Sequence, residues 1–199
     1  MIETGLDFVR AARRVRDHLG QRHRYAHTLR VARFAAMLAR AHGQDTRRAR
    51  IAGLLHDLAR LYSSERLLRE CVQRGLAIDA FERTQPIVLH ARLGAELARS
   101  DYGITDQAVL CAIAKHTVGA AEMSALDVIL YLADGLEPGR TYAGRAALAD
   151  LARRDLDAAM RDVLQSTIAY LQARGEPVAP QTIAASRTFA FPSQEKRSA

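Results

Sequence analysis

The segment GLLHDLAR, residues 53–60, places His56 and Asp57 side by side next to a stripe of leucines. Apolar residues recur here at positions i, i+3, i+4 and i+7, which is the spacing of one face of an α-helix. The stripe comprises Ile51, Leu54, Leu55 and Leu58. Two ionisable side chains therefore interrupt the inner face of a helix that we predict over residues 45–62.

The same helical periodicity continues through the rest of the chain, and no alternating β-branched stretch bounded by turn signals competes with it. The predicted fold class is therefore all-α. Caps such as Asp45, Ser63 and Ser124, and stops such as Gly20 and Gly43, set the expected helix ends. The expected helices cover residues 6–19, 25–42, 45–62, 63–75, 86–102, 105–117, 124–137 and 155–174.

The length and composition of the chain fit one domain. The chain has 199 residues, of which 49% are apolar. A chain of this size buries about 70% of its surface on folding. We expect a single helical domain over residues 1–175. Beyond Gly175 the composition shifts to prolines and polar residues, so we expect residues 176–199 to form a weakly ordered C-terminal tail.

Cysteine use and the hydrophobic pattern favour a cytoplasmic location. Cys71 and Cys111 are far apart and outside any C-x-x-C pattern, so neither a disulfide framework nor a thiolate zinc site is indicated. Arginines interrupt the first twenty residues, and no apolar run approaches the roughly 20 residues of a membrane span. We expect a soluble, intracellular protein with no membrane partner.

Four of the seven histidines, with two aspartates, lie on or beside apolar helix faces rather than on polar ones. These residues are His27, His56, Asp57, His90, His116 and Asp134. A lone histidine on such a face is more often a hydrogen-bonded core residue than a ligand. Six together are different, because buried carboxylates need a partner that neutralises them. Imidazole and carboxylate ligands suit iron, manganese, zinc or nickel.

The pair His56-Asp57, preceded by RYAHTLRVA and followed by Asp134 within YLAD, resembles the HD superfamily of metal-dependent phosphohydrolases, which are helical bundles. The segments VLHARLGAELA, AIAKHTVG and LADGLEPGRTYAG narrow the resemblance to the YqeK family of HD-type symmetrical diadenosine tetraphosphate hydrolases. The similarity runs from about residue 24 to about residue 144. The chain departs from the family pattern at Val118 and Gly135, where a second threonine and a larger residue are usual.

The resemblance implies two metal ions that share Asp57 as a bridging ligand. One ion would be held by His27, His56, Asp57 and Asp134, and the other by His90, His116 and Asp57. The resemblance also implies that the metal is iron. Two ions about 4 Å apart can share a hydroxide and bind phosphoryl oxygens, so our hypothesis is attack by this hydroxide on the polyphosphate bridge. His56 and Asp57 are the predicted catalytic residues, and the expected products are two ADP molecules.

Phosphate oxygens need cationic or hydrogen-bonding partners. The candidates for substrate binding are Arg24, Lys115, Thr117 and Arg140. The first three lie close in sequence to a predicted ligand, and Arg140 follows the helix stop Glu137-Pro138-Gly139. For the three cations the alternative is a solvated side chain, and for the threonine it is a helix end. The substrate class implied is a dinucleoside polyphosphate or another nucleotide, and a homodimer is left open.

Two other functions remain open at this point. The same metal centre would serve another HD nucleotide phosphohydrolase, such as a mononucleotide phosphatase or a hydrolase of cyclic nucleotides or guanosine alarmones. The net charge of +7 would also suit an RNA-binding adaptor, although genomic base bias explains the arginine content equally well. Such an adaptor would use basic clusters such as Arg13, Arg14 and Arg16 or Arg47, Arg48 and Arg50. Aromatic residues make up only 6% of the chain and do not alternate with the arginines, so the sequence gives nucleic-acid binding little support.

Overall fold

The computed structural model describes residues 7–190, and over this range it contains helices and no strand. This confirms the all-α prediction. The first half contains α1 (Phe8–Leu19), α2 (Arg22–Ala41), α3 (Thr46–Leu55), α4 (Ser64–Gln73), α5 (Ala80–Thr84) and the 3-10 helix η1 (Pro86–Val88). The second half contains α6 (Leu89–Tyr102), α7 (Gln107–Lys115), α8 (Ala125–Leu136), α9 (Arg145–Ala152), α10 (Leu156–Ala173) and α11 (Pro180–Ala190). Of these, α5, α9 and α11 were not predicted.

Side-chain caps set most helix starts, as the sequence predicts. The carboxylates of Asp45 and Asp106 accept hydrogen bonds from the first backbone amides of α3 and α7. Ser124 begins α8 with a capping box, in which Asp127 bonds back to the serine amide. Gly20 ends α1 in the left-handed region with a φ of 63°, which glycine adopts without the steric cost of a Cβ.

The segment that carries the HD pair departs from the prediction. Helix α3 ends at Leu55, and the residues up to Leu61 form turns instead of the expected helix to residue 62. The imidazole Nδ1 of His56 hydrogen-bonds the carbonyl of Gly53 at 2.8 Å, and in a continuing helix that carbonyl would accept from the amide of Asp57. This carbonyl belongs to the last turn of α3, so the histidine side chain bonds back to the helix that precedes it.

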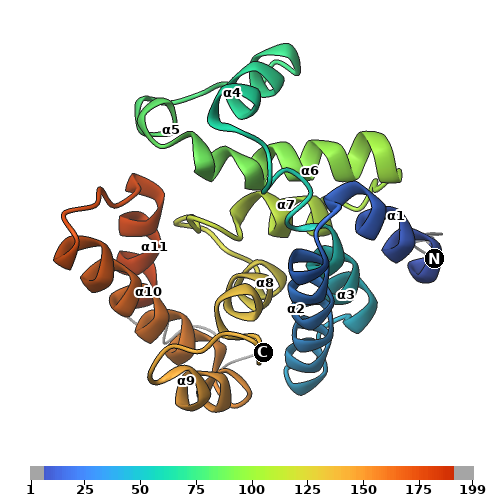
Figure 1. Cartoon of the computed structure of the whole chain (residues 1–199). Helices are drawn as coiled ribbons and strands as arrows, with labels where there is room; N and C mark the ends of the chain where they lie inside the picture. Colours follow the sequence, from blue (N-terminus) through green and yellow to red (C-terminus); the bar gives the residue numbers. More distant parts are fainter. Residues whose placement is uncertain (1–6, 191–199) are drawn as a thin grey trace.

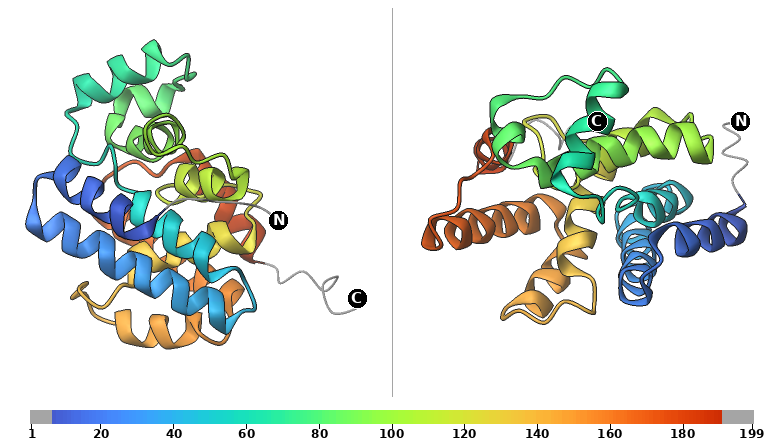
Figure 2. Two further views of the ribbon diagram at one scale, coloured as in Figure 1. Left: turned by 90° about the vertical axis from the view of Figure 1, so that its right-hand side faces the viewer. Right: turned by 45° about the horizontal axis from the view of Figure 1, so that its top comes forward.

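Helix α8 is the central element of the fold. It is buried along most of its length, as expected for a helix that is apolar on nearly every side. It contacts α2 and α3 on one side and α10 on another, and α7 also packs on it (Figure 1). Helices α4 and α5 stand at one end of the molecule (Figure 2). Segments far apart in the sequence therefore meet around α8.

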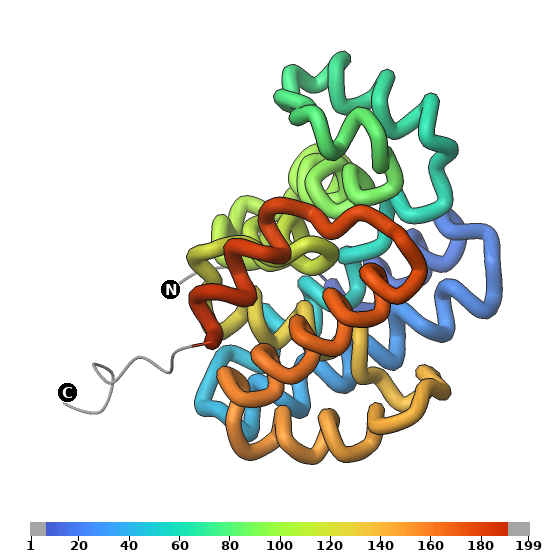
Figure 3. The backbone as a smooth tube through the Cα atoms, turned by 90° about the vertical axis from the view of Figure 1, so that its left-hand side faces the viewer, coloured from blue at the N-terminus to red at the C-terminus, as the bar shows by residue number. Residues whose placement is uncertain are grey.

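The prediction of a weakly ordered tail from residue 176 is wrong for residues 180–190. These residues form α11, which runs back beside α10 (Figure 3). Thr182 and Ala185 are buried, and the Thr182 hydroxyl donates to the carbonyl of Val118 at 2.9 Å. Pro180 begins the helix, where its fixed φ is favourable and its missing N–H costs nothing. Residues 191–199 of the expected tail lie outside the described residues.

Within residues 7–190, no helix is both long enough and apolar enough to cross a bilayer.

Candidate metal centre

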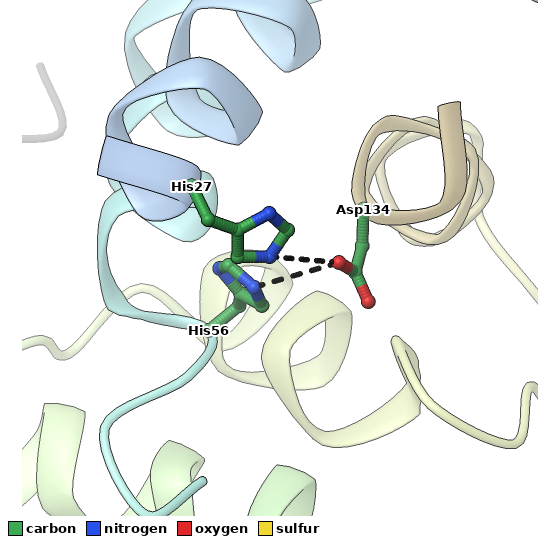
Figure 4. A group of neighbouring side chains, drawn as sticks. All are labelled: His27, His56 and Asp134. Atoms are coloured by element: carbon green, nitrogen blue, oxygen red, sulfur yellow. Dashed lines mark ion pairs between the residues drawn. The ribbon is translucent and has the colours of Figure 1, made fainter. Parts of the chain in front are cut away.

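The polar atoms of all six predicted ligands gather in one cluster, although the residues come from five separate segments of the chain. Helix α2 contributes His27, α6 contributes His90 and α8 contributes Asp134, while the remaining three follow the ends of α3 and α7. Five of the six are buried, and the side chain of Asp134 is 24% exposed. Figure 4 shows three of them, His27, His56 and Asp134, with their polar atoms facing one another.

Asp57 lies between two groups of imidazoles. Its Oδ2 is 3.9 Å from Nε2 of His27 and 3.6 Å from Nε2 of His56. Its Oδ1 is 3.5 Å from Nε2 of His90 and 4.0 Å from Nε2 of His116. Each carboxylate oxygen thus faces a different pair of imidazoles, which is the arrangement required of a ligand shared by two cations.

Asp134 completes the first of these groups. Its Oδ1 lies 3.1 Å from Nε2 of His27 and 3.9 Å from Nε2 of His56. His27, His56 and Asp134 can each offer an atom to one ion, and so can His56, Asp57 and His116, because within each group these atoms lie within 4.8 Å of one another. The described residues can therefore hold metal at two overlapping places.

Hydrogen bonds on the far side of each ring orient the imidazoles. Nδ1 of His56, His90 and His116 faces the backbone carbonyl three residues earlier, at 2.8, 2.5 and 2.7 Å respectively. A carbonyl can only accept, so Nδ1 must carry the proton in all three rings. In the neutral imidazole the lone pair is then on Nε2, which points into the pocket.

The pocket consequently brings hydrogen-bond acceptors together. Nε2 of His90 and Nε2 of His116 are only 3.2 Å apart, and both face Oδ1 of Asp57. Nε2 of His56 is buried without a hydrogen-bond partner, while Nε2 of His27 faces Oδ1 of Asp134 at 3.1 Å. Lone pairs this close repel unless a cation lies between them, so the donor set fits a metal ion.

The pKa values indicate that protons do not fill the place of the cation at His90 and His116. Burial and the charges of His56 and His90 lower the pKa of His116 to about 3, and burial also lowers the pKa of His90. Burial alone would raise the pKa of Asp57, but the neighbouring imidazoles outweigh it and hold that pKa below its usual value. A neutral ring with its lone pair free is the form that binds metal.

His27 differs from the other three histidines in its supporting partner. Its Nδ1 bonds Oε1 of Glu137 at 3.0 Å, and Glu137 in turn accepts from Arg30 and from the amide of Gly139. Burial raises the pKa of Glu137, but these hydrogen bonds outweigh it and lower the pKa to about 2. Sequence reasoning missed Glu137, treating it as part of a helix stop. Its only sequence signal is its place three residues after Asp134, on the same side of α8.

Three of the four predicted substrate contacts lie beside the metal ligands. Nη1 of Arg24 lies 3.5 Å from Oδ2 of Asp57, and Nη2 of Arg140 lies 2.8 Å from Oδ1 of Asp134. The Thr117 hydroxyl is 3.1 Å from Nε2 of His90. These three line a pocket of about 350 Å³ beside the ligands, together with Arg60, which sequence reasoning missed although it lies close after Asp57 in the sequence.

The prediction for Lys115 is corrected by the structure. Its ammonium donates to Asp127 at 2.8 Å and to the carbonyl of Glu122 at 2.9 Å. It lines a separate surface pocket with Ser124 and not the pocket of the imidazoles. Adjacent residues at the end of α7 point in different directions. Lys115 therefore does not reach the site, although it is next to His116 in the sequence.

Several of the arginines considered for RNA binding are engaged within the fold. Arg48 pairs with Asp106 at 2.7 Å, and the guanidinium of Arg14 donates to the carbonyl of Asp101. The guanidinium of Arg50 lies over the ring of Phe8 at 3.7 Å from its centroid. These side chains cap and pack helices, which accounts for them without a nucleic-acid partner.

Comparison with known proteins agrees with this site. Residues 24–139 match the family model described as HD domain, and the chain belongs to this family of helical proteins. Within it, the chain belongs with the symmetrical bis(5'-nucleosyl)-tetraphosphatases. It is 35% identical to the protein of that name from Halalkalibacterium halodurans, over 88% of this chain and 92% of the relative. It is 32% identical to the Bacillus subtilis protein of the same name, over 80% of this chain and 86% of the relative.

A solved structure has the same fold. It is described as a predicted HD superfamily hydrolase involved in NAD metabolism, from Clostridium acetobutylicum. It superposes with a TM-score of 0.89 and 34% sequence identity, and the match covers 92% of this chain and 97% of the other.

Proposed function

We propose that this chain hydrolyses diadenosine tetraphosphate symmetrically and releases two ADP molecules. The observation that carries the proposal is the position of Asp57, whose two oxygens each face a separate pair of imidazoles. The relatives named as symmetrical bis(5'-nucleosyl)-tetraphosphatases, which match most of their own length to this chain, support the choice of substrate.

The proposal includes two metal ions. His27, His56, Asp57 and Asp134 would hold one of them, and His90, His116 and Asp57 the other. We propose iron as the resident metal, with manganese, zinc and nickel as alternatives that the same ligands accept. When bound, such ions supply an activated water at neutral pH and neutralise charge on phosphoryl oxygens.

The protein side chains position the substrate. Arg24 and Arg140 stand at the pocket, each beside a ligand carboxylate, so both can exchange part of that contact for a phosphate oxygen. With metal bound, the lone pairs of the two imidazole nitrogens beside Thr117 would be engaged, and its hydroxyl hydrogen would then be free to donate to a phosphate oxygen. Arg60 adds a further positive charge to the same pocket.

His56 and Asp57 are the proposed catalytic residues, and both act through atoms already in place. The bond from Nδ1 of His56 to the carbonyl of Gly53 holds its ring, so the lone pair on Nε2 faces the reacting side of the pocket. Asp57 is held between the imidazoles and Arg24 and stays ionised, because its pKa lies below the usual value.

Product identity tests the proposal directly. The metal-loaded protein is incubated with diadenosine tetraphosphate, and the products are separated by anion-exchange chromatography. Accumulation of ADP alone supports the proposal. AMP with ATP, or no turnover beside rapid release of phosphate from a mononucleotide, would contradict it. Elemental analysis of the same preparation identifies the metal and its stoichiometry.

Asp57→Ala tests the shared-ligand role. It should abolish turnover and reduce bound metal from two ions to at most one, because both ions lose a ligand. Asp150→Ala on α9 is a matched control, since Asp150 is an exposed aspartate that pairs only with Arg153. An Asp57→Ala protein that keeps both ions would contradict the shared-ligand role while leaving the substrate assignment to the product assay.

A further inference from the structure

A second cavity opens directly beside the metal pocket. It has a volume of about 570 Å³ and lies between the loop after α8, helix α9 and helix α10. Arg140, Val163 and Thr167 line both cavities, so the two lie side by side. Figure 1 shows α9 and α10 next to each other on the side of α8 that faces away from α2.

The two cavities differ in chemistry. The metal pocket is lined by carboxylates, imidazoles and arginines. The second cavity, which we call the tyrosine groove, has only one charged side chain, Arg140, at the side shared with the metal pocket. Its other lining residues are Tyr142, Ala143, Leu148, Val163, Ser166, Thr167 and Tyr170.

Two aromatic rings stand at the surface of the groove. Tyr142 is 48% exposed and Tyr170 is 61% exposed, and they are the only tyrosines among the exposed large apolar residues of the described chain. The Tyr142 hydroxyl donates to the carbonyl of Gly135 at 3.1 Å, which anchors that ring at the edge of the metal pocket. Large exposed aromatic residues beside a catalytic pocket are a feature of ligand-binding surfaces.

We propose that the tyrosine groove is a nucleoside subsite, in which the base of one half of the substrate packs on the rings of Tyr142 and Tyr170. This inference rests on the proposed function and extends it to recognition of the base. The polyphosphate would then run past Arg140 into the metal pocket. The aromatic groove, Arg140 and the cationic pocket thus lie in the same order as the base, ribose and phosphates of a nucleotide.

Size supports the same occupant. The metal pocket has a volume of about 350 Å³, at the lower end of the range of about 300–1,000 Å³ found for ligand sites, whereas diadenosine tetraphosphate has two nucleosides besides its phosphates. The groove adds about 570 Å³ on the side that Arg140 connects. A flat base can bury both its faces against apolar side chains, and aromatic stacking contributes to this binding whatever the base.

Binding of two probes tests the subsite on the manganese-loaded protein. ADP carries the nucleoside and a diphosphate, whereas inorganic pyrophosphate carries only the phosphates. We expect wild-type protein to bind ADP more tightly than pyrophosphate. Loss of one stacking ring should weaken ADP binding by about 5- to 150-fold, which corresponds to the usual range for base stacking. Pyrophosphate affinity should change by less than about twofold, because the arginines and metal ligands remain.

The variants are Tyr142→Ala and Tyr170→Ala, with Tyr142→Phe and Tyr170→Phe as ring-preserving partners. Val72→Ala on α4 is the control, since Val72 is 65% exposed and lies outside both cavities. The phenylalanine variants should recover most of the ADP affinity that the alanine variants lose, because stacking needs the ring and not the hydroxyl. The exposed positions of both tyrosines make folded alanine variants the expectation, and thermal melting checks it.

The outcomes separate this inference from the proposed function. If wild-type protein makes ADP from diadenosine tetraphosphate but the alanine variants keep the wild-type KM and ADP affinity, the subsite is wrong and the function stands. If the alanine variants lose ADP affinity selectively while diadenosine tetraphosphate is not hydrolysed, the subsite stands and the function is wrong. Equal affinity of wild-type protein for ADP and pyrophosphate also overturns the subsite.

Discussion

Replacing Glu137 with glutamine tests whether the partner of His27 sets metal affinity. Glu137 accepts four hydrogen bonds with two oxygens. Oε1 accepts from Nδ1 of His27 at 3.0 Å and from Nη2 of Arg30 at 3.1 Å, while Oε2 accepts from Nε of Arg30 and the amide of Gly139. A glutamine has the same shape but a single acceptor oxygen, so two of the four donors must face an amide NH₂ group.

The magnitude follows from this count. A hydrogen bond to a charged group is worth about 1.5–3 kcal/mol, and the one-third exposure of Arg30 reduces its share, so we expect a stability loss of about 2–4 kcal/mol. Removal of the carboxylate also makes the His27 imidazole less basic and less firmly oriented. Changes to such supporting partners typically weaken metal binding by about 10- to 100-fold.

The assay is a chelator-competition titration of metal into metal-free protein, with unfolding in urea measured on the same samples. Glu70→Gln is the matched control, because Glu70 also pairs with two arginines, Arg66 and Arg74, but does so on α4 away from the site. We expect Glu70→Gln to leave metal affinity unchanged. A Glu137→Gln protein that binds metal as tightly as wild type would refute the supporting role.

The pH dependence of stability gives a second reading of the same substitution. The pKa of Glu137 is lowered from 4.5 to about 2, so its stabilising contribution is complete above 4.5 and is lost as the pH falls toward 2. The difference in unfolding free energy between wild type and Glu137→Gln should therefore be constant near neutral pH and shrink below pH 4.5. If the difference in unfolding free energy did not change as the pH was lowered, the stabilising role of the ionised Glu137 would be contradicted.

Three further predictions concern metal uptake, thiol reactivity and packing. Burial alone lowers the pKa of His27, but the carboxylates beside it outweigh burial and raise that pKa. Metal must therefore displace a proton from His27, and metal affinity should rise as the pH rises through the raised pKa. A chelator titration repeated over a pH series would contradict this if the affinity did not change. Burial raises the pKa of the Cys71 thiol to about 11. In native protein at mildly alkaline pH, only Cys111 should therefore react with a thiol reagent. Reaction of two thiols per chain would show instead that Cys71 is accessible. Gly53→Ala should destabilise the fold by about 1–3 kcal/mol, because the new Cβ would lie 2.7 Å from an α-carbon of α2. Gly135→Ala should leave stability unchanged, because a Cβ at that position meets open space. Equal melting temperatures of the two variants would contradict the packing argument.

Local patterns predicted much of the fold because helix signals act over a few residues. Asp45, Ser63, Asp106 and Ser124 cap the helices that the sequence places after them. The short helices α5 and α9 were missed because a helix of five to eight residues shows little periodicity. The end of α3 was missed for a different reason. The leucine stripe continues through Leu58, so the apolar pattern gives no sign that the helix ends at Leu55.

The residues of the site were predictable in identity but not in arrangement. Histidines and aspartates on apolar faces are unusual enough to be noticed, because burial of such groups needs compensation. Lys115 shows that closeness in sequence is a weak guide, since its side chain leaves α7 toward Asp127. Glu137 shows the reverse case. A glutamate beside a helix stop has no distinctive sequence feature until the fold brings it to within 3.0 Å of His27.

By itself, the sequence determined the helical class, most helix starts, the family resemblance and the six polar residues that needed a shared cation. Periodicity and capping are local properties, so they can be read without knowing which helices touch. Only the tertiary structure decided that the oxygens of Asp57 face two different imidazole pairs, that Glu137 contacts His27, and that the tyrosine groove lies beside the metal pocket. These features depend on how α2, α6, α8 and α10 pack around one another, and no short stretch of the chain encodes that packing.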